Sequence, residues 1–407
     1  MNKRQLRRYA NLLATMGGGI KKGMDVVISA ETDQPEFVKL LVEECYRAGA
    51  RKVEVDWHFQ PLQKLNVRYQ SQKTLGTLAD WEVAKLKHRA ETLPVMIYLL
   101  SEDPDGLRGM NQEKQSKATQ ERYKIIKPIR DTMENKYPWC IAAVPSEAWA
   151  KKLFPHDRKS VAVNKLWEAI FKTARVTDDP ISAWEEHNRD LAERSAYLNN
   201  LHIKKLHYKA KNGTDLTVGL MPESRFAGGE EKTLSGVRFN PNMPTEEVFT
   251  TPKRGEADGT VVATMPLSYR GELIEGFSLR FEGGKVVECH ADKNEALLKQ
   301  LLAMDDGAAY LGECALVPYD SPIRQTGILF YNTLFDENAA CHLALGMGFA
   351  DCVDGFENRT LDECHKLGVN DSIIHEDFMI GCADLSITAE TEDGKTVPIF
   401  QNGGWAF

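Results

Sequence analysis

Short apolar runs alternate with longer amphipathic stretches through roughly the first 155 residues. The strand-like runs at 25–30, 52–57, 93–100 and 139–145 contain Val, Ile and aromatic residues, which are typical of β-strands. Because strands alternate with helical stretches, the pattern predicts a mostly parallel sheet that is covered by helices.

The stretches between these runs have the periodicity of helices that pack on one side. The first begins near Pro35, and Gly49 stands where it should end. A polar helix is expected over 112–134, and Ser146 is placed to cap the helix that follows the fourth run. The apolar stripe of the first helix consists of Phe37, Leu40, Leu41, Cys45 and Ala48.

Residues 160–200 have the pattern of two helices separated by the turn TDDP. Pro180 suits the first turn of the second helix, whose apolar stripe contains Ile181, Trp184, Leu191 and Leu198. We therefore expect an α/β domain over residues 1–200 that ends in a helical bridge.

From residue 201 the pattern changes to many short β-like runs. The segment HIKKLHYKAKNGTDLTVGL predicts a hairpin with Asn212 and Gly213 at its tip. Strand-like runs continue through 259–267, 271–291 and 371–400, with few helical stretches between them. The second half is therefore expected to be an α+β, β-rich domain over residues 201–407.

Composition and charge limit the classes of protein to which this chain can belong. The chain is 42% hydrophobic and 27% charged, which is ordinary for a soluble globular protein. Its net charge of -8 argues against a nucleic-acid partner, and no run approaches the roughly 18 apolar residues that span a membrane. The segment MNKRQLRRYANLLATMGGGIKKG has no continuous apolar stretch like that of a secretory signal, so we expect a cytoplasmic protein.

The glycines and cysteines suggest no cofactor site. The run MGGGIKKG (16–23) precedes the first strand, whereas a dinucleotide fingerprint follows it, so a helix end and turn is expected and a nucleotide-dependent oxidoreductase is disfavoured. None of the eight cysteines forms a Cys-x-x-Cys pair, and most lie in apolar surroundings. Buried reduced thiols are expected, with a thiolate metal site or a disulfide framework as the alternative.

The segment IHEDFMIG places three ionisable groups inside an apolar run. If 373–380 is a strand, its period of two puts His375 and Asp377 on one face and Glu376 on the other. A histidine and a carboxylate on one face can reach a divalent ion. They can equally form a hydrogen-bonded pair at a strand end.

Three further segments carry isolated polar groups. In LFDENAACHLALG, Asp336 is expected to cap a short helix over 337–345 that ends at Gly346, with His342 inside it as either a ligand or a core histidine. Glu313 lies in the apolar run AAYLGECALVP. In NPNMPTEEVFTTP, Pro241 and Pro244 are expected to fix a turn before Glu246 and Glu247, and adjacent acids are often solvated surface.

Taken together, these segments suggest a metal site. Burying a charge costs several kcal/mol unless the charge is paired or bound to metal. Imidazole and carboxylate ligands without thiolates suit zinc, cobalt or manganese, and five such ligands are about right for two ions that share a carboxylate. The motif HExxH is absent, which argues against a single-zinc site on a helix.

Several long segments, in order, resemble the aminopeptidase T and aminopeptidase S group of bacterial metalloaminopeptidases. They are DDPISAWEEHNRDLAERSAYLN, NMPTEEVFTTP, YLGECALVP, NTLFDENAACHLALG, HEDFMIG and TVPIFQNGGWAF. The resemblance implies a dimeric exopeptidase that removes N-terminal amino acids from small peptides with two divalent ions. Carried over by motif, the metal ligands are Glu247, Glu313, His342, His375 and Asp377.

The implied mechanism is hydrolysis by a metal-activated water, with Glu313 as our candidate for both ligand and proton-transfer group. One residue departs from the family pattern, since Phe349 stands where the family commonly has a tyrosine that helps stabilise the transition state. Tyr310 or Tyr331 could supply the hydroxyl, or the enzyme could be slower. The alternative hypothesis is a dimeric metal-binding homologue with little or no peptidase activity.

Overall fold

The apolar runs of the first half form one parallel sheet in the computed structural model, which describes residues 2–407. The order of its strands is β2-β1-β3-β4-β9, and every neighbouring pair is parallel. The bounds are β1 Asp25–Glu31, β2 Lys52–His58, β3 Val95–Leu100, β4 Trp139–Ala143 and β9 Asn242–Met243. The first four strands confirm the sequence prediction, whereas β9 comes from a segment expected only to turn.

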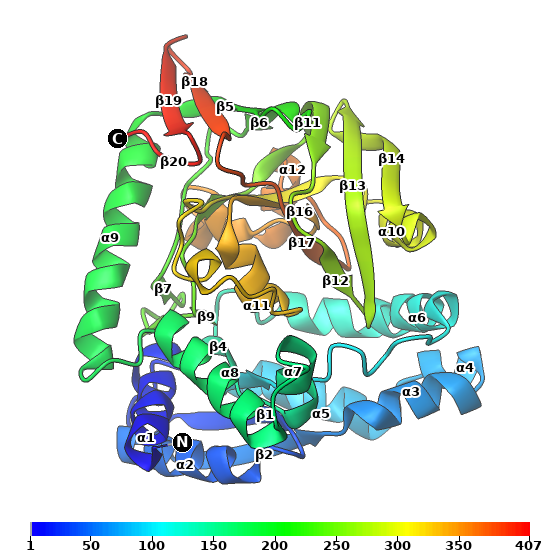
Figure 1. The fold of residues 1–407 in the computed structure, drawn as a ribbon, viewed down its shortest axis with the longest axis vertical. Coiled ribbons are helices and arrows are strands. Elements are labelled where there is room, and N and C mark those ends of the chain that lie inside the picture. The colour runs from blue at the N-terminus through cyan, green and yellow to red at the C-terminus, as the bar shows by residue number, and fades with distance from the viewer. Residues whose placement is uncertain (1) are drawn as a thin grey trace. The chain divides into compact units, whose positions relative to one another are not determined.

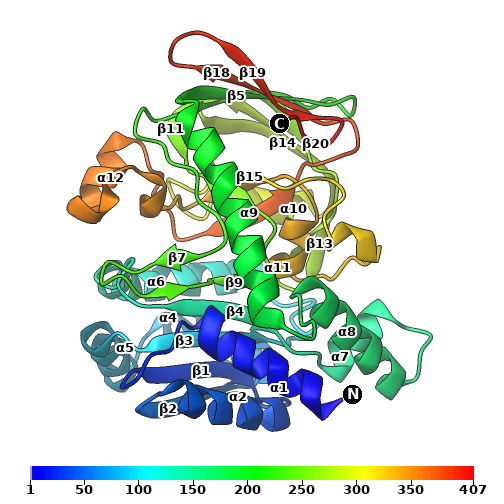
Figure 2. The ribbon, with the colours of Figure 1, turned by 90° about the vertical axis from the view of Figure 1, so that its left-hand side faces the viewer.

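Helices cover this sheet where the amphipathic stretches predicted them (Figure 2). α2 contacts β1 and β2, and α1 packs on α2. The predicted caps are present: Gly49 follows α2 with φ 109°, and the Ser146 side chain accepts a hydrogen bond from the Trp149 N–H. The bounds are α1 Lys3–Leu12, α2 Pro35–Ala48, α3 Gln60–Tyr69, α4 Gln72–Gly76, α5 Asp80–Thr92, α6 Gln112–Asp131, α7 Glu147–Leu153, α8 Lys159–Thr173 and α9 Pro180–Asn200.

The chain divides into two compact units that do not follow its linear order. The first unit contains residues 1–189, 229–245 and 328–330, and the second contains 190–228, 246–327 and 331–407. The predicted division after residue 200 is contiguous, whereas the boundary between these units falls within α9. The segment 229–245 belongs to the first unit because it supplies β9 and the short hairpin of β7 Glu231–Lys232 and β8 Arg238–Phe239.

The second unit is rich in antiparallel strands, which confirms the predicted α+β class (Figure 1). Its larger sheet has the order β12-β13-β11-β6-β5-β18-β19-β20, with β14 paired to β13. The predicted hairpin at Asn212 and Gly213 joins β5 to β6. The bounds are β5 Ile203–Lys209, β6 Asp215–Leu220, β11 Pro252–Val262, β12 Leu267–Tyr269, β13 Glu272–Glu282, β14 Lys285–Lys293, β18 Ser386–Thr391, β19 Thr396–Gln401, β20 Gly404–Trp405, α10 Glu295–Leu302 and α12 Leu361–Leu367.

A smaller antiparallel sheet in this unit has the order β10-β15-β16-β17. Its strands are β10 Val248–Thr250, β15 Leu311–Leu316, β16 His342–Gly346 and β17 His375–Met379. One face packs into the main hydrophobic core of the unit through Val248, Cys314, Leu316, Leu343, Leu345 and Phe378. The opposite face carries Glu313, His342, His375 and Asp377.

The helix predicted over 337–345 is wrong. The segment forms the short helix α11 Thr333–Asp336, a 3-10 turn Glu337–Ala339, and then strand β16. Asp336 therefore ends a helix rather than capping one, and its Oδ2 accepts a hydrogen bond from the Asn332 N–H at 3.0 Å. The run CHLALG fits a strand buried on both faces as well as a buried helix, and pairing with β15 and β17 on either side decides for the strand.

The remaining sequence-level predictions concern the thiols and the membrane. All eight cysteines are free, as predicted, and most are buried. Within residues 2–407, no helix is both long enough and apolar enough to cross a bilayer.

Gly346 allows β16 and β17 to approach closely at the end of the sheet. Its φ is 102°, and a Cβ built there would lie 2.2 Å from the carbonyl oxygen of Ile374. Gly394 has a similar φ of 79°, but a Cβ there would meet nothing within 4 Å. Comparing substitutions at the two positions therefore separates the effect of backbone strain from that of steric overlap.

We expect Gly346→Ala to destabilise the protein more than Gly394→Ala. The positive φ costs about 1–2 kcal/mol at either position, and the overlap adds about 1–3 kcal/mol at Gly346 only. Urea-denaturation midpoints of the two variants and the wild type measure the difference. Equal midpoints for the two variants would show that the sheet tolerates a methyl group at this approach.

Candidate metal centre

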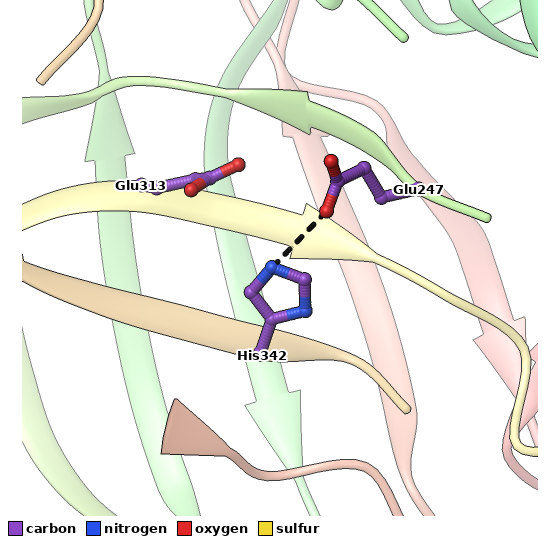
Figure 3. Close-up of side chains that lie close together, drawn as sticks. All are labelled: Glu247, Glu313 and His342. Atoms are coloured by element: carbon purple, nitrogen blue, oxygen red, sulfur yellow. Dashed lines mark ion pairs between the residues drawn. The ribbon is translucent and has the colours of Figure 1, made fainter. Parts of the chain in front are cut away.

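The four strands of the smaller sheet bring the five predicted site residues to one face. In the register of the sheet, Ala315 pairs with His342, Glu313 with Ala344, and Ala344 with Asp377. Side chains at alternate positions share a face, so Glu313, His342, His375 and Asp377 project together. Glu247 immediately precedes β10 and reaches the same cluster, which Figure 3 shows for Glu247, Glu313 and His342.

The cluster consists of two overlapping triads of possible ligand atoms. Glu247, Glu313 and His342 form one, and Glu313, His375 and Asp377 form the other, with the ligand atoms of each triad within 4.8 Å of one another. His342 Nε2 lies 3.3 Å from Glu247 Oε2, and His375 Nε2 lies 3.1 Å from Glu313 Oε2. Glu313 belongs to both triads, so its carboxylate stands between two positions where a cation fits.

Backbone carbonyl groups determine which nitrogen of each histidine faces the cluster. His342 Nδ1 lies 3.3 Å from the oxygen of Ala340, and His375 Nδ1 lies 2.8 Å from the oxygen of Met347. A carbonyl oxygen can only accept, so both Nδ1 atoms carry the proton. Each Nε2 must then either bind a second proton or offer its lone pair to a cation.

Burial makes the charges of the cluster interdependent. Glu247, Glu313, His342 and Asp377 are all buried. Burial, reinforced by the Glu247 and Asp377 carboxylates, raises the pKa of Glu313 to about 7 although His375 opposes the shift. Burial acts to lower the pKa of His342, but the carboxylate of Glu247 beside it outweighs burial and raises that pKa to about 9.

The residues fit divalent cations. Asp377 Oδ1 is buried, accepts no hydrogen bond, and lies 3.3 Å from His375 Nε2 and 4.0 Å from His342 Nε2. Several carboxylates and two imidazoles without a thiolate form the donor set that zinc, cobalt or manganese accepts. A cation at each triad would compensate the carboxylate charge that the two histidines leave unbalanced.

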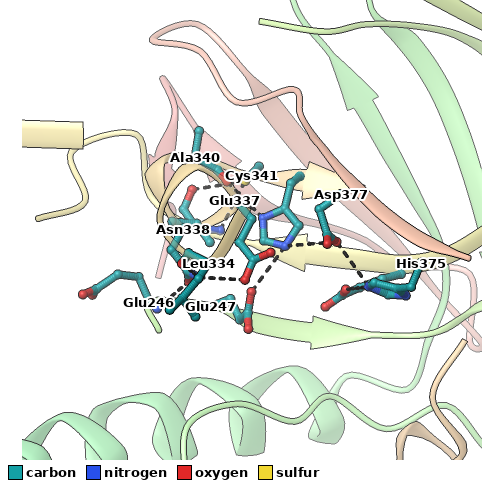
Figure 4. Close-up of polar contacts among 12 residues, drawn as sticks. Glu246, Glu247, Leu334, Glu337, Asn338, Ala340, Cys341, His375 and Asp377 are labelled. Carbon is teal, nitrogen blue, oxygen red and sulfur yellow. Dashed lines mark hydrogen bonds and ion pairs between the residues drawn. The ribbon is translucent and has the colours of Figure 1, made fainter. Parts of the chain in front are cut away.

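Sequence reasoning missed two residues beside the cluster, Glu337 and Asn338 (Figure 4). The Asn338 amide donates to Glu337 Oε1 at 3.3 Å. Burial, reinforced by the Asp377 carboxylate, raises the pKa of Glu337 well above its usual range. The signal was present in FDENAACH, where polar residues directly precede a buried run. A helix over 337–345 would instead place Glu337 more than a turn away from His342.

The two acids adjacent to predicted ligands lie elsewhere, as the sequence suggested. The carboxylate of Glu246 points away from the cluster, although its N–H donates to Asn338 Oδ1 at 2.7 Å (Figure 4). Glu376 lies opposite Leu345 in the register of the sheet, on the core side of β17. Burial, together with the Asp377 carboxylate, raises the pKa of Glu376 to about 7, and Arg270 opposes the shift.

Phe349 also lies at the cluster. Its ring centroid is 4.8 Å from that of His375 and 5.6 Å from that of Phe249. Buried Thr251 fixes its backbone, because Thr251 Oγ1 accepts from the Phe349 N–H at 2.8 Å and also lies 3.3 Å from the Phe349 oxygen. Tyr310, one of the two tyrosines considered as substitutes, lies beneath the guanidinium of Arg254.

Comparisons with known proteins agree with this geometry. The family model described as thermophilic metalloprotease (M29) matches residues 2–405. Aminopeptidase AmpS of Bacillus subtilis is 42% identical over 405 residues, which are 99% of this chain and 98% of that protein. The structure of wild-type AmpT from Thermus thermophilus is 38% identical and superposes with a TM-score of 0.89, with 100% of both chains covered.

A more distant structure shares the fold alone. The 2,5-dihydroxypyridine dioxygenase of Pseudomonas putida superposes with a TM-score of 0.51 at 12% identity, over 99% of this chain and 96% of that one. The fold therefore does not determine the reaction, and the side chains of the site must do so.

The raised pKa of Glu376 should affect how the stability of the metal-free protein depends on pH. The folded-state pKa of Glu376 is raised, so the stability that its proton contributes is present below about pH 4.5 and is lost as the pH rises through about 7. As the pH rises from 5 to 8, the free energy of unfolding of Glu376→Gln should therefore increase by roughly 2–3 kcal/mol relative to that of the wild type. Urea denaturation in the presence of chelator measures this difference. Parallel pH dependences for the two proteins would show that Glu376 keeps an ordinary pKa.

Proposed function

The chain belongs to the thermophilic metalloprotease (M29) family and is a metalloaminopeptidase, and from that premise we propose that it removes N-terminal residues from small peptides with two divalent ions. The proposed ligands are Glu247, Glu313, His342, His375 and Asp377. Glu313 would help to hold both ions, because it belongs to both triads. Zinc, cobalt and manganese all suit this set of ligands.

The observation that carries the proposal is the pair of triads that meet at Glu313. A single ion needs three or four protein ligands, whereas five donors arranged in two overlapping groups match two ions that share one carboxylate. The orientation of both histidines supports the same conclusion, because each Nδ1 is occupied by a carbonyl and each Nε2 faces the carboxylates.

The protein residues prepare the site for hydrolysis. When bound, the two ions supply Lewis acidity, which makes water more acidic and polarises the scissile carbonyl. Glu313 Oε2 is the proposed acceptor of the proton from the attacking water, and the same oxygen returns it to the leaving amine. The carbonyls of Ala340 and Met347 hold the two imidazoles in place, so neither imidazole has to reorient during the reaction.

The family relationship supports two further parts of the proposal. Small peptides are the proposed substrates, because the relatives are named as aminopeptidases. A homodimer is the proposed assembly, as expected from the family that the sequence resembles.

We expect chelation to abolish hydrolysis of aminoacyl chromogenic substrates, and zinc, cobalt or manganese to restore it. A panel of substrates tested before and after each metal is returned gives the activity and the side-chain preference together. N-acetylated substrates are the control, since an enzyme that requires a free amine should not release product from them. Activity that survives complete removal of metal would contradict the proposal, and so would equal hydrolysis of the acetylated panel.

The phenylalanine at position 349 supports a second candidate function. In it, the protein is a metal-binding relative of these enzymes with little turnover. The ring of Phe349 lies against His375, where the tyrosine expected from the family resemblance would present a hydroxyl. A phenyl ring cannot donate a hydrogen bond to a developing oxyanion. A missing donor of this kind lowers kcat by about 10²–10³-fold.

Phe349→Tyr should therefore raise kcat, because it returns a hydroxyl donor beside His375. The expected gain is about 10²-fold, the lower end of the effect of one oxyanion donor. Phe249→Tyr is the matched control, because it adds the same hydroxyl to the neighbouring ring. A nearly inert wild type that gains activity in Phe349→Tyr would support the second candidate. An active wild type that gains nothing would indicate that another residue, such as Tyr310 or Tyr331, supplies the donor.

A further inference from the structure

A tripeptide with two glycines carries the carbonyl group that orients His375. It consists of Gly346, Met347 and Gly348, at the end of β16. The Met347 oxygen lies 2.8 Å from His375 Nδ1. Glycine restricts the backbone less than any other residue, so this segment cannot hold that carbonyl in one direction by itself. Contacts from elsewhere in the chain must do so.

Asn370 makes contacts on both sides of Met347. Its backbone oxygen accepts from the Gly348 N–H at 2.8 Å, and its Nδ2 donates to the Gly346 oxygen at 2.6 Å. The Gly348 N–H and the Met347 carbonyl belong to one planar peptide group, so a bond to the first fixes the direction of the second. The preceding peptide group is held between Asn370 and Ile374, because the Met347 N–H donates to the Ile374 oxygen at 2.7 Å.

The Asn370 amide also bonds to a second segment. Its Nδ2 donates to the Gly307 oxygen at 2.9 Å, and Asp305 fixes that turn, since Asp305 Oδ1 accepts from the Gly307 N–H at 2.9 Å. The same Oδ1 accepts from the Ser372 hydroxyl at 2.8 Å. The side chain of Asn370 is completely buried, and its own Oδ1 accepts no hydrogen bond within residues 2–407. The amide therefore acts only as a donor that joins two backbone carbonyls.

We propose that Asn370 is a positioning residue for the ion of the triad Glu313, His375 and Asp377. The inference rests on the proposed function, which assigns an ion to that triad. Asn370 holds the Met347 carbonyl, and this carbonyl accepts the Nδ1 proton of His375. Nε2 then faces the carboxylates of Glu313 and Asp377 at 3.1 and 3.3 Å. Groups that fix the second nitrogen of a metal-binding histidine typically change the metal affinity by ~10–100-fold.

The other triad does not depend on Asn370. Its histidine, His342, is oriented by the Ala340 oxygen, which lies 3.3 Å from Nδ1. Within the described chain, no hydrogen bond joins Asn370 to either of these residues. Loss of the Asn370 amide should therefore weaken the binding of one ion and leave the other ion in place.

The test measures the two ions separately. Metal-free protein is titrated with cobalt(II) in equilibrium dialysis, and the visible absorption of the bound ions is recorded at each step. The proteins are the wild type, Asn370→Ala, His375→Gln, the double variant of these two, and Asn240→Ala. Asn240 is the matched control, because it is a comparably buried asparagine of the first unit whose amide bonds to Asn188.

We expect the wild type and Asn240→Ala to bind two ions, each with the same affinity in both proteins. In Asn370→Ala, the affinity for one ion should fall by ~10–100-fold with a changed absorption spectrum, and the other ion should bind as before. Asn370→Ala should add no further loss to that of His375→Gln, because both changes act on the same ligand.

A second measurement needs no metal. In protein labelled with ¹⁵N-histidine, the Nδ1–H signal that His375→Gln removes belongs to His375. The exchange of this proton with water should be at least ~10-fold faster in Asn370→Ala, because the carbonyl that accepts it is then less well fixed. If Asn370→Ala does not fold, Asn370→Ser keeps one shorter donor and should show both effects to a smaller extent.

Equal loss of both ions from Asn370→Ala would overturn the assignment, since it would show a general disturbance of the sheet. Losses that add in the double variant would also overturn it, because Asn370 would then act independently of His375. Unchanged affinities and unchanged exchange would leave Asn370 no role at the site. A wild type that binds fewer than two ions would contradict the proposed function, and the exchange of the Nδ1 proton would then decide the role of Asn370 alone.

Discussion

The second unit depends on one electrostatic constraint, which is that buried carboxylates need cations. Glu247, Glu313 and Asp377 lie on one face of a small sheet whose other face is packed into the hydrophobic core. Their mutual repulsion in a medium of low dielectric cannot be relieved by water. The histidines compensate part of this charge, and divalent ions would compensate the rest. Bound cations would therefore stabilise the polar face, whereas burial of apolar side chains stabilises the face behind it.

Much of the architecture could be predicted because the relevant signals are local. The runs that became β1, β3 and β4 are mostly apolar, as strands in the middle of a covered sheet must be, whereas the run that became β2 at the sheet edge alternates apolar and charged residues. Gly49 and Ser146 ended and began helices where their backbone preferences require. The spacing of His375 and Asp377 predicted that both side chains lie on one face, because residues two apart in a strand point to the same side of the sheet. Five possible ligands could be proposed from polar groups in apolar surroundings, and the family resemblance selected the same set.

The predictions from the sequence failed for segments whose local structure is determined by pairing with distant strands. The run around His342 fits a helix or a strand equally well, and only its two neighbouring strands decide between them. The proximity of Glu337 to Asp377 depends on that choice, so it could not be inferred from the sequence. The pairing of β9 with β4 could not be predicted either. A strand of two residues has no recognisable periodicity, and its partner lies about 100 residues earlier.

The position of β9 has a consequence for synthesis on the ribosome. The edge of β4 is completed only by Asn242 and Met243, which leave the ribosome about 100 residues after β4 itself. At about 5–20 residues per second, this edge stays unpaired for roughly 5–20 s in every nascent chain. Unpaired edges are where strands of different chains associate. The first unit is thus most exposed to misassembly early in translation, and crowding of ribosomes on one messenger would increase that exposure.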